Sequence, residues 1–370
     1  MKSIERIELS VFELVYRHYF ETSFGREEGR TGIIVRVFSE GLCGYGEVVA
    51  DKFPLYSYET TATARLLLKE LLIPLVFSDG IREPDDFAAR AAVYKGHAMA
   101  KAGLELALWD LKAKRSGIPL SRLYGAERRE VNSGVSVGIQ DTIPQLLERI
   151  ENFLTEGYPR IKIKIKPGWD TAVCREIRRR WPGLPLQVDA NARYTPADTD
   201  RLRELDEFDL TMLEQPFTGE DLWDHARLQK LIRTPICLDE SAKSFLAVRQ
   251  ARELGSGRIV NIKVGRVGGI GEARRIHDFC LDQGMPVWCG GMLETGIGRA
   301  HNIHLAALPG FQLANDISAS RRYFDRDLID PEIELTGEGT IAVPEGPGIG
   351  VNPDEKRIRD VTLLHETFSA

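Results

Sequence analysis

Five charged residues recur at nearly constant spacing through the middle of the chain. They are Lys164, Asp189, Glu214, Asp239 and Lys263, and the successive intervals are 25, 25, 25 and 24 residues. If the three carboxylates converge, mutual repulsion and burial raise their pKa values, and a divalent cation would relieve both effects. Because the ligand set contains only oxygen, with no histidine or cysteine, the sequence favours Mg²⁺, and after it Mn²⁺, over zinc.

The two lysines add candidate bases to this set. A nearby dication and partial burial both favour the neutral amine over the ammonium form. A neutral lysine is a competent general base, so the set suits abstraction of a proton α to a carboxylate, with the metal stabilising the enediolate. Lys162 and Lys166 share the face of Lys164, and spacing alone does not choose among the three.

Short apolar runs indicate the strands that must carry these residues. The segment 160–168 alternates aliphatic residues with lysines, and the runs 186–189, 210–214, 236–239 and 259–263 end on the later members of the set. A helix-like segment follows each run, which is the repeat of a (β/α)₈ barrel, where strand carboxyl ends converge on one mouth. A single acidic residue at the end of a strand is more often the cap of the following helix. A single row of lysines is more often the solvated edge of a sheet. Three acids on successive strands favour a shared site.

The same pattern extends to a whole barrel. It predicts strand one over 131–138 with its helix over 142–156, strand seven over 286–289 and strand eight over 311–313. The glycine-rich turn 290–296 leads into a helix, where free backbone N–H groups could hold an anionic group.

The first part of the chain has a different pattern. Loose alternation predicts antiparallel strands over 4–15 and 32–49. The segment 18–28 between them is too long for a tight hairpin, and with 51–57 it forms a pair of candidate lids. Helices are predicted over 60–72, 84–94 and 99–115, and Trp109 on the last of these is assigned to core packing.

Length and composition set the domain plan. A chain of 370 residues with 43% hydrophobic and 28% charged residues suits one barrel of about 250 residues plus roughly 100 more. We predict an α/β protein with a (β/α)₈-type, modified TIM barrel over residues 126–320 and an α+β capping domain over 1–125. The segment 321–370 lacks barrel periodicity and is predicted to return to the capping domain.

Several classes of protein are disfavoured. The chain has no run of 18 apolar residues and no signal-peptide pattern at its start, so we expect a cytoplasmic protein without a membrane partner. The net charge of −6 gives no support for nucleic-acid binding. The five cysteines are odd in number and form no C-x-x-C pair, so we expect buried, reduced thiols. A homo-oligomer is expected because symmetric assemblies are common.

Longer motifs carry a resemblance to a known family. The order Lys-x-Lys, Asp, Glu, Asp, Lys resembles the enolase superfamily, in the subgroup that includes muconate lactonizing enzyme. The finer likeness is to the o-succinylbenzoate synthase / N-succinylamino acid racemase family, and it runs from residues 22–25 to residues 346–348. The motifs are GVSVG at 134–138, KIKIKPGWD at 162–170, DAN at 189–191, EQP at 214–216, CLDES at 237–241, NIKVGRVGG at 261–269 and WCGGMLETG at 288–296.

The resemblance implies a role for each of these residues. The acid/base pair would be Lys164 and Lys263, and the Mg²⁺ ligands Asp189, Glu214 and Asp239. Lys162 would lie near the substrate carboxylate, and the loops near residues 20 and 50 would cap the barrel. The other substrate-binding residues would be Ser136, Asn191, Phe20, Tyr56, Gly291, Met292 and Glu294. Apart from the resemblance, Arg266 lies three residues beyond Lys263, and if its guanidinium turns toward the site, this fixed cation would disfavour the ammonium form of Lys263.

The sequence leaves several functions open. The family reactions are dehydration of a cyclohexadiene carboxylate to o-succinylbenzoate in menaquinone synthesis, in which Lys263 would act only through its charge, and racemisation of N-succinyl or other N-acyl amino acids. Another enolase-superfamily activity, such as a dipeptide epimerase or a muconate cycloisomerase, is an alternative. A Schiff-base lysine enzyme is a further one, although it gives the three carboxylates no task. A catalytically silent barrel conflicts with the full set of candidate bases and ligands.

Overall fold

The structure, a computed structural model, describes residues 4–78 and 81–370. The first three residues, part of the segment that lacks a signal-peptide pattern, lie outside this description. Within the two described ranges, none of the helices combines the length and the apolarity that crossing a lipid bilayer requires.

A parallel sheet lies at the centre of the larger part of the molecule. Within the described residues it has seven strands in the order β11-β10-β9-β8-β7-β6-β5. The strands are β5 Val135–Val137, β6 Ile161–Lys164, β7 Leu186–Asp189, β8 Met212–Glu214, β9 Ile236–Leu238, β10 Ile259–Ile262 and β11 Val287–Cys289. This arrangement, with a helix after nearly every strand, confirms the predicted (β/α)₈-type barrel.

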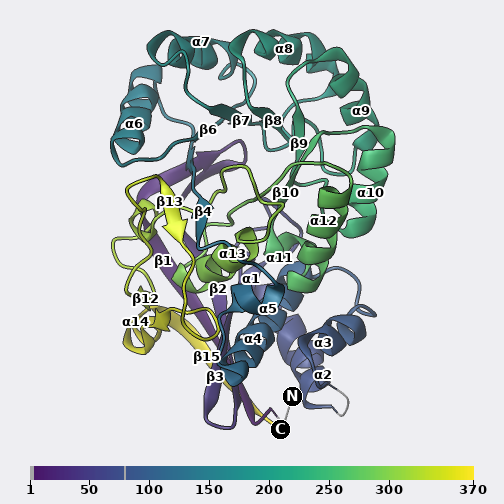
Figure 1. Ribbon diagram of the computed structural model, residues 1–370, viewed down its shortest axis with the longest axis vertical. Coiled ribbons are helices and arrows are strands. Elements are labelled where there is room, and N and C mark those ends of the chain that lie inside the picture. The colour runs from purple at the N-terminus through teal and green to yellow at the C-terminus, as the bar shows by residue number, and fades with distance from the viewer. Residues whose placement is uncertain (1–3, 79–80) are drawn as a thin grey trace.

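Helices enclose this sheet. In Figure 1 the helices α6 to α10 and α12 follow one another around the outside of the parallel strands. The barrel helices are α6 Ile143–Thr155, α7 Thr171–Arg180, α8 Thr199–Glu204, α9 Leu222–Leu231, α10 Phe245–Leu254, α11 Val264–Val267, α12 Ile270–Asp282 and α13 Gly296–Ala306. Short 3₁₀ turns at Pro196–Asp198 and Leu205–Phe208 flank α8.

The eighth position of the barrel is irregular. The sequence predicts a strand over 311–313, but the structure has only isolated bridges at Phe311 and Asn315. Asn315 completes the closure with its side chain, because its Oδ1 accepts from the N–H of Cys289 at 2.7 Å and its Nδ2 donates to the carbonyl of Asn132 at 2.9 Å. The side-chain amide of Asn315 thus takes the place of backbone hydrogen bonds between strands. The alternation of apolar residues in the sequence does not predict such a substitution.

The predicted strand one, over 131–138, is divided. Only β5 joins the barrel, whereas β4 Glu130–Asn132 pairs antiparallel with β13 Thr340–Ala342. At the break, a Cβ on Gly134 would lie 2.4 Å from the guanidinium carbon of Arg160. The predicted strand is therefore interrupted where Gly134 packs against Arg160, and the local sequence pattern does not predict this contact.

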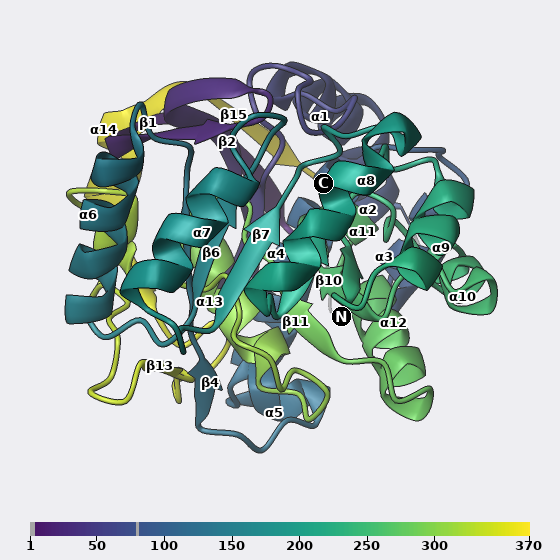
Figure 2. The same ribbon diagram turned by 90° about the horizontal axis from the view of Figure 1, so that it is seen from above.

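The capping domain is built on a four-stranded antiparallel sheet in the order β15-β1-β2-β3. The strands are β1 Arg6–Thr22, β2 Gly25–Ser39, β3 Leu42–Val48 and β15 Thr362–Ser369. Figure 2 shows β15 beside β1 and β2 along one edge of the molecule, so the C-terminal tail contributes to the capping sheet. The smaller C-terminal elements are the 3₁₀ turn Ser320–Arg322, the pair β12 Ile329–Asp330 and β14 Asn352–Pro353, and α14 Glu355–Val361.

Helix α4 packs very closely on the capping sheet. The capping helices are α1 Thr61–Leu67, a π-helical turn Leu68–Leu72, α2 Ile73–Phe77, α3 Pro84–Ala91, α4 Ala98–Ser116 and α5 Leu120–Tyr124. A Cβ on Gly46 of β3 would lie 2.1 Å from the carbonyl oxygen of Gly103, so only glycine permits this approach. Trp109 on α4 is buried in the core, as predicted.

The turn between β1 and β2 differs from the prediction. The sequence predicts 18–28 as a connection too long for a tight hairpin, but both strands extend into it and Thr22 pairs with Gly25 across a two-residue turn. A register shift earlier in the hairpin breaks the alternation on which the prediction depends. The candidate lid is therefore the end of a long hairpin.

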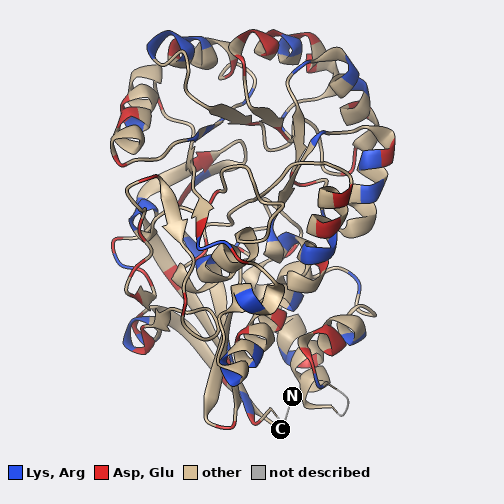
Figure 3. Ribbon diagram, viewed as in Figure 1, with Lys and Arg blue, Asp and Glu red and all other residues tan. Residues whose placement is uncertain are grey.

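Surface charge and thiols follow ordinary patterns. Figure 3 shows lysines and arginines interspersed with acidic residues along α7 to α10. All the cysteines are free; Cys174, Cys237, Cys280 and Cys289 are buried, as predicted, whereas Cys43 is half-buried.

Asn315→Ala should weaken the closure of the barrel. The substitution leaves the buried N–H of Cys289 without its acceptor, which costs roughly 1–3 kcal/mol of unfolding free energy. Urea unfolding would measure this cost against Asn152→Ala, which removes an exposed amide on α6. Equal stability of the two variants would contradict the closing role of Asn315.

Candidate active site

The carboxyl ends of the barrel strands bring the five spaced residues together. Lys164 pairs with Asp189 and Asp189 pairs with Glu214 on three neighbouring strands. Asp239 directly follows β9, and Lys263 directly follows β10. Alternation turns the isoleucines of β6 toward the helices and its lysines inward. Because the carboxyl ends of parallel barrel strands lie at one mouth, the five residues meet there.

Lys162 lies at the centre of a buried ion cluster. Its Nζ is 2.5 Å from Asp316, 2.9 Å from Glu214 and 3.4 Å from Asp189. The same nitrogen lies 4.7 Å from the centroid of the Trp288 ring. Burial lowers the pKa of Lys162, but the three carboxylates outweigh burial and hold it well above its ordinary value. Lys162 therefore acts as a fixed cation beneath the mouth.

The two predicted base lysines contact different carboxylates. Lys164 Nζ lies 2.5 Å from Asp189 Oδ2. Lys263 Nζ lies 2.7 Å from Asp239 Oδ2 and 3.3 Å from the hydroxyl of Tyr56. In the sheet order β7, β8 and β9 separate the strands of the two lysines, so the lysines approach the mouth from different sides.

Arg266 turns its guanidinium toward the site. The predicted effect of Arg266 on Lys263 depends on this orientation. Its Nη1 contacts Asp239 and lies 3.4 Å from the hydroxyl of Tyr56. Burial lowers the pKa of Lys263, Asp239 raises it, and Arg266 lowers it again, with a net rise. Burial raises the pKa of Asp239, but Lys263 and Arg266 outweigh burial and lower it.

Glu214 differs from the other two predicted ligands in that its pKa is raised, whereas the pKa values of Asp189 and Asp239 are lowered. Burial, followed by the neighbouring carboxylates, raises the pKa of Glu214 to about 7. Gln187 and Asn261 donate to it at 3.0 and 2.8 Å. The amide oxygens of these two residues, with Oδ1 of Asn191 and Oε2 of Glu240, have no hydrogen-bond partner among the described residues. This excess of buried acceptors suits a cation.

The donor set fits a hard divalent cation. Asp189, Glu214 and Asp239 offer only oxygen and are at most 1% exposed. In the described part of the chain no three such side chains already surround a common point, and lysines and Arg266 contact the carboxylates instead. An ion bound here would therefore compete with these ion pairs.

The backbone just beyond the predicted ligands is left-handed. Asn191, Ala192 and Gln215 have φ angles of +42°, +59° and +38°, although none is glycine. The N–H of Asn191 donates to Asp189 Oδ1 at 2.9 Å, and the N–H of Ala192 donates to the carbonyl of Gln215 at 2.8 Å. Strained backbone of this kind clusters at functional sites. Here it orients the Asp189 carboxylate.

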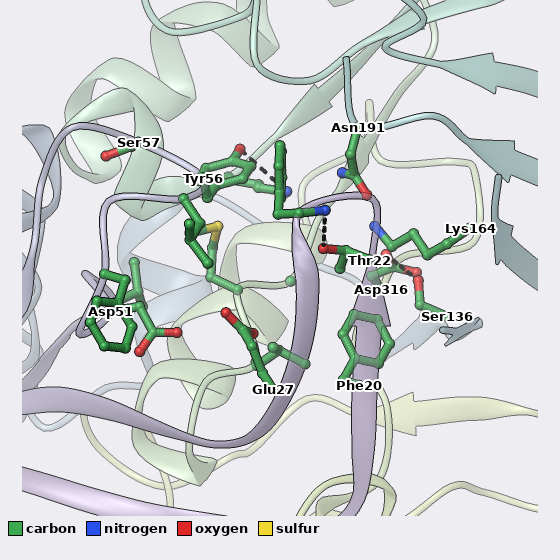
Figure 4. A pocket seen from close by; sticks show the side chains of 18 of the residues that line it. Phe20, Thr22, Glu27, Asp51, Tyr56, Ser57, Ser136, Lys164, Asn191 and Asp316 are labelled. Atoms are coloured by element: carbon green, nitrogen blue, oxygen red, sulfur yellow. Dashed lines mark hydrogen bonds between the residues drawn. The ribbon is translucent and has the colours of Figure 1, made fainter. Parts of the chain in front are cut away.

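A cavity lies above these residues, between the barrel and the capping domain (Figure 4). Its lining includes most of the predicted substrate-binding residues and both base lysines: Phe20, Tyr56, Ser136, Lys162, Asn191, Gly291, Met292, Lys164 and Lys263. Glu294 is not among the described lining residues. Its carboxylate accepts from the N–H of Met292 at 2.8 Å and from Nδ2 of Asn302 at 2.9 Å. Glu294 thus supports the loop that carries Met292.

The protein itself supplies an anion at the glycine-rich turn 290–296. Glu47 of β3 accepts from the N–H groups of Thr295 and Gly298 at 3.1 and 3.0 Å, at the start of α13. Arg30 pairs with Glu47 at 3.5 Å and donates to the carbonyl of Met292 at 2.6 Å. The N–H groups that the sequence offers to a ligand therefore hold the capping domain against the barrel.

Sequence reasoning missed three acidic residues of the site. Asp316 follows the irregular eighth segment, where no strand end marks it. Glu240 lies beside Asp239, and burial followed by neighbouring carboxylates raises its pKa to about 8. Glu27 lines the cavity from β2, within the segment predicted as a loop. Of the three, only Glu240 had a usable signal, which was its place next to a predicted ligand.

Comparison with known proteins agrees with this geometry. Residues 6–125 match the model of the mandelate racemase / muconate lactonizing enzyme N-terminal domain, and residues 145–357 match that of the enolase C-terminal domain-like family. The chain belongs to the enolase superfamily.

Several members of the superfamily match this chain over nearly its whole length. An o-succinylbenzoate synthase of Geobacillus stearothermophilus is 49% identical over 367 residues, covering 99% of this chain and 98% of that protein. An N-succinylamino acid racemase of Thermus thermophilus is 46% identical over 367 residues and covers 99% of both. A crystal structure of an enolase-superfamily protein from Listeria innocua has a TM-score of 0.95 at 40% identity, with 99% of each chain covered.

Asp316→Asn should destabilise this enolase-superfamily fold. Asp316 pairs with Lys162 at 2.5 Å and with Arg160 at 2.8 Å, so its loss leaves buried cations poorly neutralised, at a cost of roughly 3–5 kcal/mol. Asp325→Asn is the matched control, because its ion pair with Arg17 is exposed and should contribute less than about 1 kcal/mol. Unfolding free energies of both variants, measured in chelator, would test the difference; similar losses would contradict it.

Proposed function

We propose that this protein is a Mg²⁺-dependent enzyme that abstracts a proton α to a carboxylate, acting as an o-succinylbenzoate synthase, an N-succinylamino acid racemase, or both. The main support is that Lys164 and Lys263 reach one cavity from opposite sides of three buried carboxylates. The relatives at 49% and 46% identity carry these two names. Both reactions begin with the same proton abstraction, so one site can serve either.

In this proposal Asp189, Glu214 and Asp239 hold the metal. Mg²⁺, or Mn²⁺ in its place, would supply fixed positive charge beside the carboxylate on which negative charge develops. The desolvation of Glu214 and the unpartnered acceptor oxygens around it support this assignment.

The lysines carry the proton. The lysine that acts as base must first be neutral, which a metal would favour by taking over the carboxylate that now pairs with that lysine. The neutral lysine then takes the proton from Cα, the Cα–H bond breaks, and its electron pair passes into the substrate carboxylate to give an enediolate. In racemisation the ammonium of the other lysine returns a proton to the opposite face of Cα, so the proton count is unchanged. In the dehydration Lys164 acts as base and then protonates the leaving hydroxyl, which departs as water, and Lys263 contributes its charge.

The remaining site assignments are part of the same proposal. Lys162 would lie near the substrate carboxylate, and the substrate contacts would come from Ser136, Asn191, Phe20, Tyr56, Gly291, Met292 and, through its loop, Glu294. We also propose a capping domain over residues 1–125, a barrel domain over 126–320, a returning segment over 321–370 and a homo-oligomeric state.

Activity should require the metal and each of its ligands. Asp189→Ala, Glu214→Ala and Asp239→Ala should each lower kcat/KM by roughly 100-fold or more, because each removes charge stabilisation of the transition state. Calorimetry should show weakened Mg²⁺ binding by the same variants. Asp200→Ala, whose side chain is 96% exposed, is the control. Full turnover after exhaustive EDTA treatment would refute the metal requirement.

Substitution of each lysine in turn should show which face of the substrate Cα that lysine serves. In a racemase, Lys164→Ala and Lys263→Ala should each stop interconversion of enantiomers, yet the surviving lysine should still exchange the α-proton of the enantiomer that it faces. The measurement is α-proton exchange in D₂O for each enantiomer and each variant, by NMR. In the dehydration, both variants should be impaired and only Lys164→Ala should abolish the chemistry.

One result would reject this pair. If both variants exchange the same enantiomer at the same rate, the two-base assignment fails. Lys162 or Lys166 would then become the better candidate for a base, and their substitutions could be compared in the same exchange assay.

A further inference from the structure

Two carboxylates face the cavity from the capping domain. Glu27 comes from β2 and Asp51 follows β3, and both line the same cavity as the base lysines. Figure 4 shows their carboxylates turned toward one another, on the other side of the cavity from Lys164 and Asn191. The capping wall is therefore acidic, opposite a mouth that carries lysines.

These two carboxylates are poorly neutralised by the protein. The Glu27 carboxylate has no hydrogen bond or ion pair within the described residues, and the bonds to Asp51, from Thr31 and from the N–H of Lys52, all go to Oδ1. Arg30 and Lys164 are the cations that lower the pKa of Glu27. However, the guanidinium of Arg30 is directed to Glu47 and to the carbonyl of Met292, and the ammonium of Lys164 pairs with Asp189. An oxygen of each carboxylate thus stays available to a ligand.

Desolvation makes a cation more favourable at this wall. Burial, and after it the charge of Asp51, raises the pKa of Glu27 to about 7. A positive group between the two carboxylates would offset both effects, whereas an anionic group would add to the repulsion. At the other end of the cavity, the unpartnered Oδ1 of the buried Asn191 also indicates that this space is built for a ligand.

Apolar side chains also line this cavity. Phe20, Val49, Met99 and Met292 belong to the same lining as the base lysines and the two carboxylates. A lysine or arginine side chain suits such a mixed lining, because its aliphatic stem packs on apolar groups while its head carries positive charge.

We propose that the preferred substrate is an N-acyl amino acid with a cationic side chain, held with its α-carboxylate at the lysine mouth and its ammonium or guanidinium head between Glu27 and Asp51. This inference rests on the proposed function, and it favours racemisation over dehydration. The cyclohexadiene substrate has no cationic group to place at the acidic wall.

Wild-type enzyme can test the charge preference directly. N-succinyl-L-arginine and N-succinyl-L-citrulline have nearly the same shape and the same succinyl group, and they differ in the charge of the side-chain head. We expect kcat/KM for racemisation of the arginine compound to exceed that of the citrulline compound by roughly tenfold or more, since charge-assisted hydrogen bonds are about twice as strong as neutral ones. A ratio near one would overturn the inference.

Variants then locate the preference. Glu27→Gln and Asp51→Asn should each reduce the arginine-to-citrulline ratio severalfold, whereas Glu28→Gln, an exposed neighbour outside the cavity lining, should leave the ratio unchanged. A fall of equal size for both compounds would overturn the assignment to Glu27 and Asp51.

Proton exchange keeps the two proposals distinguishable. If either compound exchanges its α-proton in D₂O but the wild-type ratio is near one, the proposed function stands and the substrate inference fails. If neither compound nor any other carboxylate exchanges, the proposed function fails and the substrate inference fails with it.

Discussion

The organisation of this molecule depends on burying many charges at one place. Asp189, Glu214 and Asp239 lie at the carboxyl ends of adjacent strands and are almost fully buried, so each must be balanced at short range. Lys162, Lys164 and Lys263 supply much of that balance, and removing one carboxylate leaves its buried partner cation with less opposite charge around it. The register of the parallel sheet brings Lys164, Asp189 and Glu214 side by side, and Asp316 and Arg266 from outside the sheet complete the set of partners.

In the proposed function, the same balance would help the site to accept a metal and a substrate. The ion pairs that stabilise the protein are also the contacts that a dication and a substrate carboxylate would replace. The incoming charges would meet buried partners of opposite charge, so the net electrostatic cost of loading the site is smaller than for an apolar pocket. Lys162 contacts Asp189, Glu214 and Asp316, and Arg266 contacts Asp239. These two cations are suited to neutralise the carboxylates that a substrate or metal does not engage.

The sequence predicted the centre of the molecule better than its edges. Regular spacing placed Lys164, Asp189 and Glu214 correctly at strand ends, because in-register strands repeat the same local pattern. It failed at the closure, where Asn315 bonds through its side chain, and at the β1–β2 hairpin, where a register shift hides the strand pattern. Glu27 was missed for the same reason. Long-range contacts decide these places, and no local period encodes them.

The capping domain is joined to the barrel at the N-terminus of α13, a kind of site that can bind an anionic ligand. Glu47 occupies the N-terminus of α13, and Arg30 links it to the loop of Met292. The position of that loop, and with it one wall of the cavity, therefore depends on residues of the capping sheet.

Pairing of β1 with β15 has a consequence for biosynthesis. Ser10 and His365 are hydrogen-bonded although 355 positions separate them. The barrel strands leave the ribosome before β15 does, so the charged mouth can assemble while the capping sheet still lacks its outer strand. Contacts so distant in sequence form slowly, and during that interval β1 presents an open edge to the strands of neighbouring nascent chains.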